Sequence, residues 1–87
     1  MTRVKPANEA GARIGRIVRG WRIDQGIDQP TLARMTGLSQ EYISKLERGL
    51  SADPGISRVI RIAQALGHTV PELLEAAGLI ERENGKS

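Results

Sequence analysis

The chain has 87 residues, enough for one domain, and we expect no catalytic or ligand-sensing domain of ordinary size beside it. It contains no cysteine, which excludes disulfides, a thiolate metal site and a cysteine nucleophile, and which fits a cytoplasmic protein. Lysine and arginine outnumber aspartate and glutamate by 13 to 10, and before Val70 the balance is 11 bases to 6 acids. A basic body with an acidic C-terminal end favours a polyanionic partner, although a solvated charged surface explains the same balance.

The sequence offers no membrane segment and no catalytic or metal-binding motif. Its apolar runs fall far below the roughly 20 residues that span a bilayer, and no apolar block follows Met1 to Lys5 as it would in a signal peptide. His68 is the sole histidine and has no second ligand at metal-binding spacing, so we interpret it as a surface or capping residue. We therefore expect no enzyme activity, no catalytic residue, no metal, no cofactor and no small-molecule ligand.

Apolar residues recur at helical spacing, and glycine interrupts them every 10 to 20 residues, as is typical of short helices joined by tight turns. The chain therefore predicts an all-α fold of five helices, at about 8–24, 29–36, 40–48, 55–66 and 70–78. With one Trp, one Tyr and no Phe, the core must be aliphatic. The predicted core residues are Val18, Trp21, Leu32, Ile43, Leu46, Ile60, Ala63 and Leu66. The buried stripe predicted for the fourth helix is Ile56, Val59, Ile60, Ala63 and Leu66.

Side chains that accept hydrogen bonds mark the predicted helix starts. Asn8, Asp28 and Ser39 are expected to cap the first three helices, because their oxygen atoms can accept from N–H groups of the first turn. Thr69 and Glu72 form a capping-box pattern before the fifth helix.

The first helix contains two glycines as well as an apolar stripe. Ile14, Val18 and Trp21 lie on one face at helical spacing. Gly15 and Gly20 each lower the helix propensity by about 1 kcal/mol, so packing must hold this helix together.

Residues 29–49 have the pattern of a helix-turn-helix, because two short helices share a short turn that contains Gly37. On a wheel of 100° per residue, the second of these helices separates Ile43 and Leu46 from a polar arc of about 140°. The arc offers amide, hydroxyl, carboxylate and cationic groups, which read base edges in a major groove, although an ordinary amphipathic surface helix has the same form. Its residues are Gln40, Glu41, Ser44, Lys45 and Arg48.

A longer set of residues between Ile14 and Leu74 follows one order with almost no gaps. It comprises Ile14-Gly15, Arg22, Leu32-Ala33, Gly37-Leu38-Ser39, Ile43-Ser44, Leu46-Glu47-Arg48-Gly49, Pro54, Ile62-Ala63, Ala65-Leu66-Gly67 and Glu72-Leu73-Leu74. In these residues the chain resembles the Cro/phage-repressor, or Xre-type, family of DNA-binding domains. The resemblance implies a five-helix, lambda-repressor-like domain. We place this domain at residues 10–80, between a flexible basic arm (1–9) and a polar tail (81–87).

The resemblance implies DNA contacts at matching positions. It implies that Gln40, Glu41, Ser44 and Lys45 contact bases. It implies that the following residues contact phosphates: Arg22, Gln29, Ser39, Tyr42, Arg48 and Ser51. Alternatives remain open at three of these positions: N-terminal solvation for Gln29, a capping role alone for Ser39, and cover of the core for Tyr42.

Arg22 and Glu47 match a family pair that joins the first helix to the third. The wheel turns Glu47 toward the inside, and a half-buried carboxylate needs a partner, which arginine can supply in bidentate form. We expect a structural pair that also aims Arg22 toward a phosphate.

Two departures from the family affect the expected binding. The loop at 50–55 carries no basic residue where some relatives have one, so its DNA contacts are expected to be limited to Ser51 and backbone N–H groups. Glu41 is an acid that faces a polyanion, which favours discrimination between bases over tight binding.

The expected function is that of a sequence-specific DNA-binding transcriptional regulator, with repression favoured over activation, which binds a palindromic operator in double-stranded DNA as a homodimer. A self-complementary apolar patch would form the dimer interface, with packing against the first helix as the alternative. Its predicted residues are Leu74, Ala77, Leu79 and Ile80. The second function considered is an antitoxin-like or assembly protein that uses the same fold mainly to hold a protein partner.

Overall fold

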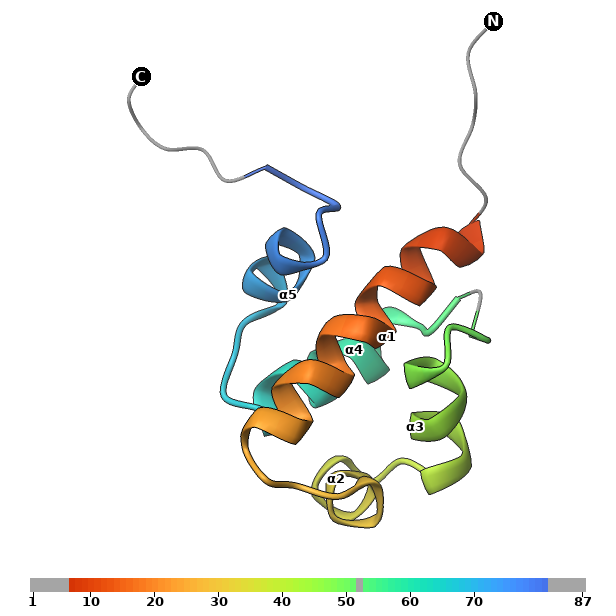
Figure 1. The fold of residues 1–87 in the computed structure, drawn as a ribbon, viewed down its shortest axis with the longest axis vertical. Helices are drawn as coiled ribbons and strands as arrows, with labels where there is room; N and C mark the ends of the chain where they lie inside the picture. Colours follow the sequence, from red (N-terminus) through yellow and green to blue (C-terminus); the bar gives the residue numbers. More distant parts are fainter. Residues whose placement is uncertain (1–6, 52, 82–87) are drawn as a thin grey trace, which may run out of the picture.

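The computed structural model describes residues 7–51 and 53–81, and these residues form five helices and no strand. The helices are α1 (Ala7–Asp24), α2 (Gln29–Thr36), α3 (Gln40–Glu47), α4 (Ile56–Ala65) and α5 (Val70–Ala76). In Figure 1, α1 runs diagonally through the centre of the view, with α2 and α3 on one side, α5 on the other and α4 behind it. The predicted all-α, five-helix class is confirmed. No helix in the described part of the chain has both the length and the apolar character needed to cross a membrane.

The three later N-caps form as predicted. The Asp28 carboxylate accepts from the Thr31 N–H at 2.9 Å, and the Ser39 hydroxyl accepts from the Tyr42 N–H at 3.0 Å. At α5, Thr69 and Glu72 form both hydrogen bonds of a capping box. The Thr69 N–H and the His68 ring lower the pKa of Glu72, because both stabilise its carboxylate.

The start of α1 differs from the prediction. The helix begins at Ala7, so Asn8 lies inside it and is not its N-cap. Ala7 also lies within the range expected to form the basic arm. Residues 8 and 9 of that range are helical as well, whereas residues 1–6 of the arm and 82–87 of the predicted tail lie outside the described residues.

A single aliphatic core joins all five helices. Six of the eight predicted core residues are buried: Val18, Leu32, Ile43, Leu46, Ala63 and Leu66. Ile14, Ala33, Val59, Ile62, Leu73 and Ala77 complete the core. Through it α1 packs against α3 and α5, and α4 packs against α2 and α5.

Ile60 was predicted to be buried, and this prediction is wrong. Its side chain is 38% exposed, whereas Ile62 is 1% exposed, and Ile56 of the predicted stripe is 67% exposed. At 100° per residue, the buried arc of α4 is centred between Ile62 and Ala63, which leaves Ile56 and Ile60 at its edge. The packing of α4 against α2 and α5 sets this rotation, and apolar spacing alone does not define it.

Trp21 was also predicted as a core residue, but it is only partly buried. Its indole stacks on the His68 imidazole, with ring centroids 3.7 Å apart and planes inclined by 11°. His68 Nδ1 lies 3.2 Å from the Glu72 carboxylate, so His68 connects the C-terminal half of α1 with the first turn of α5. The stack replaces burial for one face of the indole, and a partner 47 positions away gives no local sequence signal.

Gly15 marks the point of closest approach between α1 and α3. A β-carbon at this position would lie 1.8 Å from the Leu46 carbonyl oxygen. Contact with a backbone atom explains why α1 accepts a helix-weakening residue there. At Gly20, in the same helix, no atom lies within 4 Å of a β-carbon placed there, so the structure gives no packing reason for a glycine at this position.

Candidate nucleic-acid interface

The turn between α2 and α3 fixes how α3 is presented. Gly37 has a φ of 73°, in the left-handed region that favours glycine, and its N–H donates to the Ala33 carbonyl. The Thr36 hydroxyl donates to the Leu32 carbonyl at 2.8 Å and accepts from the Leu38 N–H at 3.3 Å. These bonds satisfy the end of α2 and define the short turn that leads into α3.

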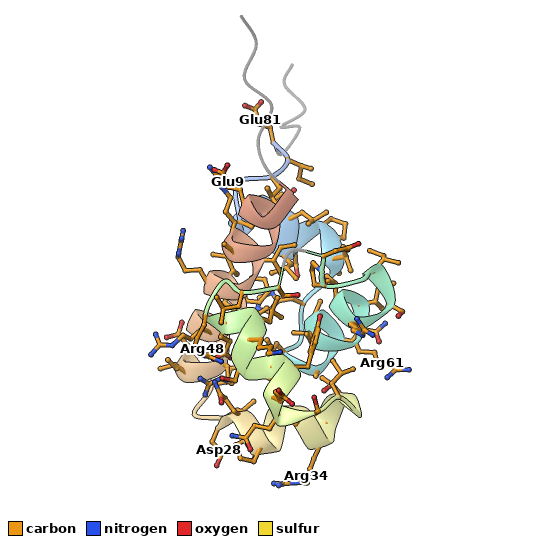
Figure 2. All side chains as sticks on the ribbon, turned by 90° about the vertical axis from the view of Figure 1, so that its right-hand side faces the viewer. Glu9, Asp28, Arg34, Arg48, Arg61 and Glu81 are labelled. Atoms are coloured by element: carbon orange, nitrogen blue, oxygen red, sulfur yellow. The ribbon has the colours of Figure 1, made fainter. Side chains whose placement is uncertain are left out.

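α3 has one buried face and one polar face, in the register that the helical wheel predicts. Ile43, Leu46 and Glu47 are buried. The polar face is formed by exposed Gln40, Glu41, Lys45 and Arg48 and by half-buried Ser44. Figure 2 views α3 from outside, with Arg48 on one side of it and Arg61 of α4 on the other.

The acid on the polar face lies next to a base. Lys45 Nζ is 3.8 Å from the Glu41 carboxylate, and the two side chains are 55% and 80% exposed. A pair so open to water is weak and easily separated. Both groups therefore remain available to a ligand that approaches this face.

Arg22, Gln29 and Glu47 form a bonded network that joins α1, α2 and α3. Arg22 Nε and Nη2 donate to the two Glu47 oxygens at 2.7 and 2.9 Å, and Nη1 donates to the Ile27 carbonyl at 2.7 Å. The side chains of Arg22 and Glu47 are 11% and 1% exposed. Hydrogen bonding to Glu47 raises the pKa of Arg22 above its already high value. All three guanidinium nitrogens are thus used within the protein.

Gln29 has an internal partner that the sequence did not indicate. Its Nε2 donates to Glu47 Oε1 at 3.1 Å. Because an amide nitrogen carries two hydrogens and an amide oxygen only accepts, one donor remains on this side chain. The bond fixes Gln29 at the start of α2, directly beside α3.

Tyr42 and Ser39 also have internal bonds. The Tyr42 hydroxyl donates to the Pro54 carbonyl at 2.7 Å, and the Arg58 guanidinium lies 5.3 Å above the Tyr42 ring. Burial raises the pKa of Tyr42, and the Asp53 carboxylate acts in the same direction, whereas Arg58 opposes it. The Tyr42 proton is therefore committed to Pro54. Ser39 is the N-cap of α3, and its hydroxyl oxygen accepts from the Tyr42 N–H, which leaves its own proton free to donate.

The remaining expected phosphate contacts lie at the C-terminal end of α3. Arg48 is exposed and donates from Nε to the Ser44 carbonyl at 3.4 Å. Ser51 lies half-buried in the loop that follows. Figure 2 shows Arg48 between the two ends of the molecule, with the acids Glu9 and Glu81 toward one end and Asp28 and Arg34 at the other.

Most of the residues expected to form a dimer interface are buried or partly buried within the chain itself. Ala77 is 7% exposed, and Leu74 and Leu79 pack partly buried against the core. Ile80 is 43% exposed. The structure therefore agrees with intramolecular packing for most of this set, and it leaves Ile80 as the main outward apolar group.

The arrangement is that of a helix-turn-helix domain, and a comparison with protein families gives the same result. The "Helix-turn-helix" family model matches residues 18–73, and the chain belongs to this family, in its Xre-type branch. The resemblance stated from the sequence is confirmed.

Three curated proteins are similar to the chain. The HTH-type transcriptional regulator SlrR of Bacillus subtilis is 35% identical over 63 residues, which cover 72% of this chain and 41% of SlrR. The HTH-type transcriptional regulator SinR of the same organism is 29% identical over 62 residues, 71% of this chain and 56% of SinR. Control protein C.SmaI of Serratia marcescens is 37% identical over 62 residues, 71% of this chain and 73% of that protein. The chain thus spans about two fifths of SlrR and just over half of SinR.

Proposed function

We propose that this chain is a sequence-specific DNA-binding transcriptional regulator, which acts in the cytoplasm as a repressor on a palindromic operator. The observation that carries the proposal is the polar face of α3. It presents five groups that can read bases or phosphates, while the opposite face is anchored in the core. The names of SlrR and SinR, both transcriptional regulators, support the same function.

In this proposal α3 lies in the major groove with its N-terminal residues toward the bases. The Gln40 amide matches the donor and acceptor pair of adenine, Lys45 matches the acceptors of guanine, and Glu41 can accept from cytosine N4. Ser44 adds a short hydroxyl that donates or accepts.

The proposed phosphate contacts differ in how many donors they keep free. Gln29 keeps one N–H, and Ser39 keeps its hydroxyl proton. Arg48 is exposed at the far end of α3, and Ser51 follows it in the loop. Tyr42 donates its one proton to Pro54, so its part in binding is to hold the edge of α3 in place. Arg22 uses three of its five N–H groups on Glu47 and Ile27, which holds Glu47 and through it Gln29, and it keeps two N–H groups for the proposed phosphate contact.

Selection from a random duplex pool tests the proposal. The wild type should enrich a short consensus, and Gln40→Ala should lose preference at one or two base positions. Gln64→Ala is the matched control, because Gln64 is an exposed glutamine on α4. A wild type without a consensus, or a Gln40→Ala variant that selects the wild-type consensus, contradicts the assignment of the polar face.

Dimerisation on two half-sites roughly 34 Å apart is part of the proposal, because one recognition helix covers too few base pairs to single out a site. Leu74, Ala77, Leu79 and Ile80 remain the proposed interface, with Ile80 as its most exposed member and Leu79 partly buried beside it. Changing Leu79 and Ile80 to Ser should give a folded monomer that binds full operators far more weakly than the wild type but half-sites equally well. Sedimentation that shows an unchanged dimer would refute this interface.

A protein-binding role, like that of an antitoxin or an assembly factor, is the alternative. It predicts no DNA consensus and no salt-dependent DNA affinity. A gel shift against random duplex with a salt titration separates the two functions, because phosphate contacts give a steep dependence on salt.

A further inference from the structure

The loop between α3 and α4 carries no cation to meet a DNA phosphate strand at one edge of α3. A helix in the major groove, which is about 12 Å wide, has a phosphate strand on each side. Gln29, which bonds to Glu47, lies toward one side of α3. On the other side stands Tyr42, whose hydroxyl is bonded to Pro54, and residues 49–55 contain no lysine or arginine.

Arg58 lies at this edge although it belongs to α4. Its guanidinium stands 5.3 Å above the Tyr42 ring, and Nη1 lies 3.5 Å from the Pro54 carbonyl oxygen. Tyr42, Pro54 and Arg58 thus form one contact group, which we call the Tyr42 cluster. Gly55 connects Pro54 to α4, which carries Arg58, and its φ of 85° sets the direction in which the chain enters this helix.

The chemistry of Arg58 suits an anion. The residue is exposed, and its hydrogen bond to the Pro54 carbonyl uses only Nη1, at the outer limit of bonding distance. The ring and the carbonyl restrict where the side chain points, which reduces the entropy that a contact would cost. The rest of the guanidinium fork matches a phosphate in bidentate form.

We propose that Arg58 binds a backbone phosphate of the DNA strand that passes the Tyr42 edge of α3, and so supplies from α4 the cation that the loop lacks. The proposal rests on the proposed function of α3 as the recognition helix. It makes Arg58 a contact to the backbone and not to bases, so the residue sets affinity without choosing the sequence.

The position of Asp53 adds a second consequence. Its carboxylate accepts from the Gly55 N–H at 3.3 Å and acts electrostatically on Tyr42, so it lies close to the same edge. A negative charge there repels the phosphate that Arg58 attracts. Asp53→Asn should therefore tighten binding to all sequences by a few-fold at low salt, and less as salt screens the charge.

Salt titration of affinity tests the proposal with matched variants. One phosphate contact contributes about 0.9 to the slope of log affinity against log salt. Between 50 and 200 mM salt the wild type should therefore lose about 3.5-fold more affinity than Arg58→Gln. Arg13→Gln and Glu9→Gln are the controls, because these two side chains pair with each other. Arg13 also donates to the Ala77 carbonyl at the end of α5, which lies on the opposite side of α1 from α3 (Figure 1).

The outcomes are distinct. Arg58→Gln with a lower slope and an unchanged selected consensus supports the proposal, and Arg58→Lys should keep the slope because it keeps the charge. An Arg58→Gln slope equal to that of Arg13→Gln, or a changed consensus, overturns it. Thermal melting by circular dichroism checks that Arg58→Gln is folded. If Arg58→Gln is unfolded, the DNA affinity of Asp53→Asn takes its place as the test. An Asp53→Asn affinity equal to that of Glu9→Gln then overturns the proposal. A wild type without consensus or salt dependence instead refutes the proposed function, and the Arg58 contact falls with it.

Discussion

One added methyl group at Gly15 tests how α1 packs against α3. The β-carbon of Gly15→Ala would meet the Leu46 carbonyl oxygen at 1.8 Å, whereas real β-carbons essentially never come within 3.0 Å of such an atom. Because the obstacle is backbone, the two helices must separate by more than 1 Å. Overpacking of this kind costs about 1–3 kcal/mol or more, which exceeds the gain of about 1 kcal/mol in helix propensity.

Gly20→Ala in the same helix is the matched control. No atom lies within 4 Å of a β-carbon there, so the variant should gain about 0.5–1 kcal/mol from helix propensity alone. For a domain of this size, 1 kcal/mol moves the melting temperature by roughly 4–8 °C. The two variants should therefore melt on opposite sides of the wild type.

Thermal and urea unfolding followed by circular dichroism measures both changes. We expect Gly15→Ala to have the lower urea midpoint and Gly20→Ala the higher one. If Gly15→Ala were as stable as Gly20→Ala, the close approach of α1 to the Leu46 carbonyl would be absent in solution, and the placement of α3 derived from it would be wrong.

Three further predictions follow from the site and the caps. Lys45→Ala should cost roughly 1–3 kcal/mol on the selected operator and relax one base position, whereas Gln29→Ala should weaken all sequences about equally; equal profiles for the two variants would refute the division between base and phosphate contacts. Arg22→Ala should destabilise folding by about 3–5 kcal/mol, because it leaves Glu47 buried without its charge partner, and an unchanged melting temperature would contradict this. The pKa of Glu72 is lowered from its ordinary 4.5, so its contribution is complete above that pH and is lost as the pH falls through the lowered value. The stability difference between wild type and Glu72→Gln should accordingly shrink on acidification, and a difference constant from pH 7 to pH 3 would refute it.

Local chemistry is the part of the fold that the sequence predicts well. The caps at Asp28, Ser39 and Thr69 and the turn at Gly37 depend on groups within three or four residues of each other. The polar face of α3 follows from the 100° step of the helix, and it needs no knowledge of the neighbours.

Features that depend on tertiary contacts could not be predicted in the same way. The isoleucines of α4 do not all lie on one face of the helix, so they do not all pack into the core. The packing of α4 against α2 and α5 decides that Ile62 is buried and Ile60 is not. Trp21 stacks on His68, and Tyr42 bonds to Pro54, through partners that no short motif connects.

Glu47 shows why stability and recognition are linked in this domain but separable along α3. Its carboxylate accepts hydrogen bonds from Arg22 of α1 and Gln29 of α2. One buried group on α3 therefore joins three helices and also positions Gln29, a proposed phosphate contact. The outward residues of α3, all within about two turns of Glu47, make no comparable bond to the core. Base preference can therefore change at Gln40 or Lys45 with little loss of stability, whereas a change at Glu47 must affect folding and binding together.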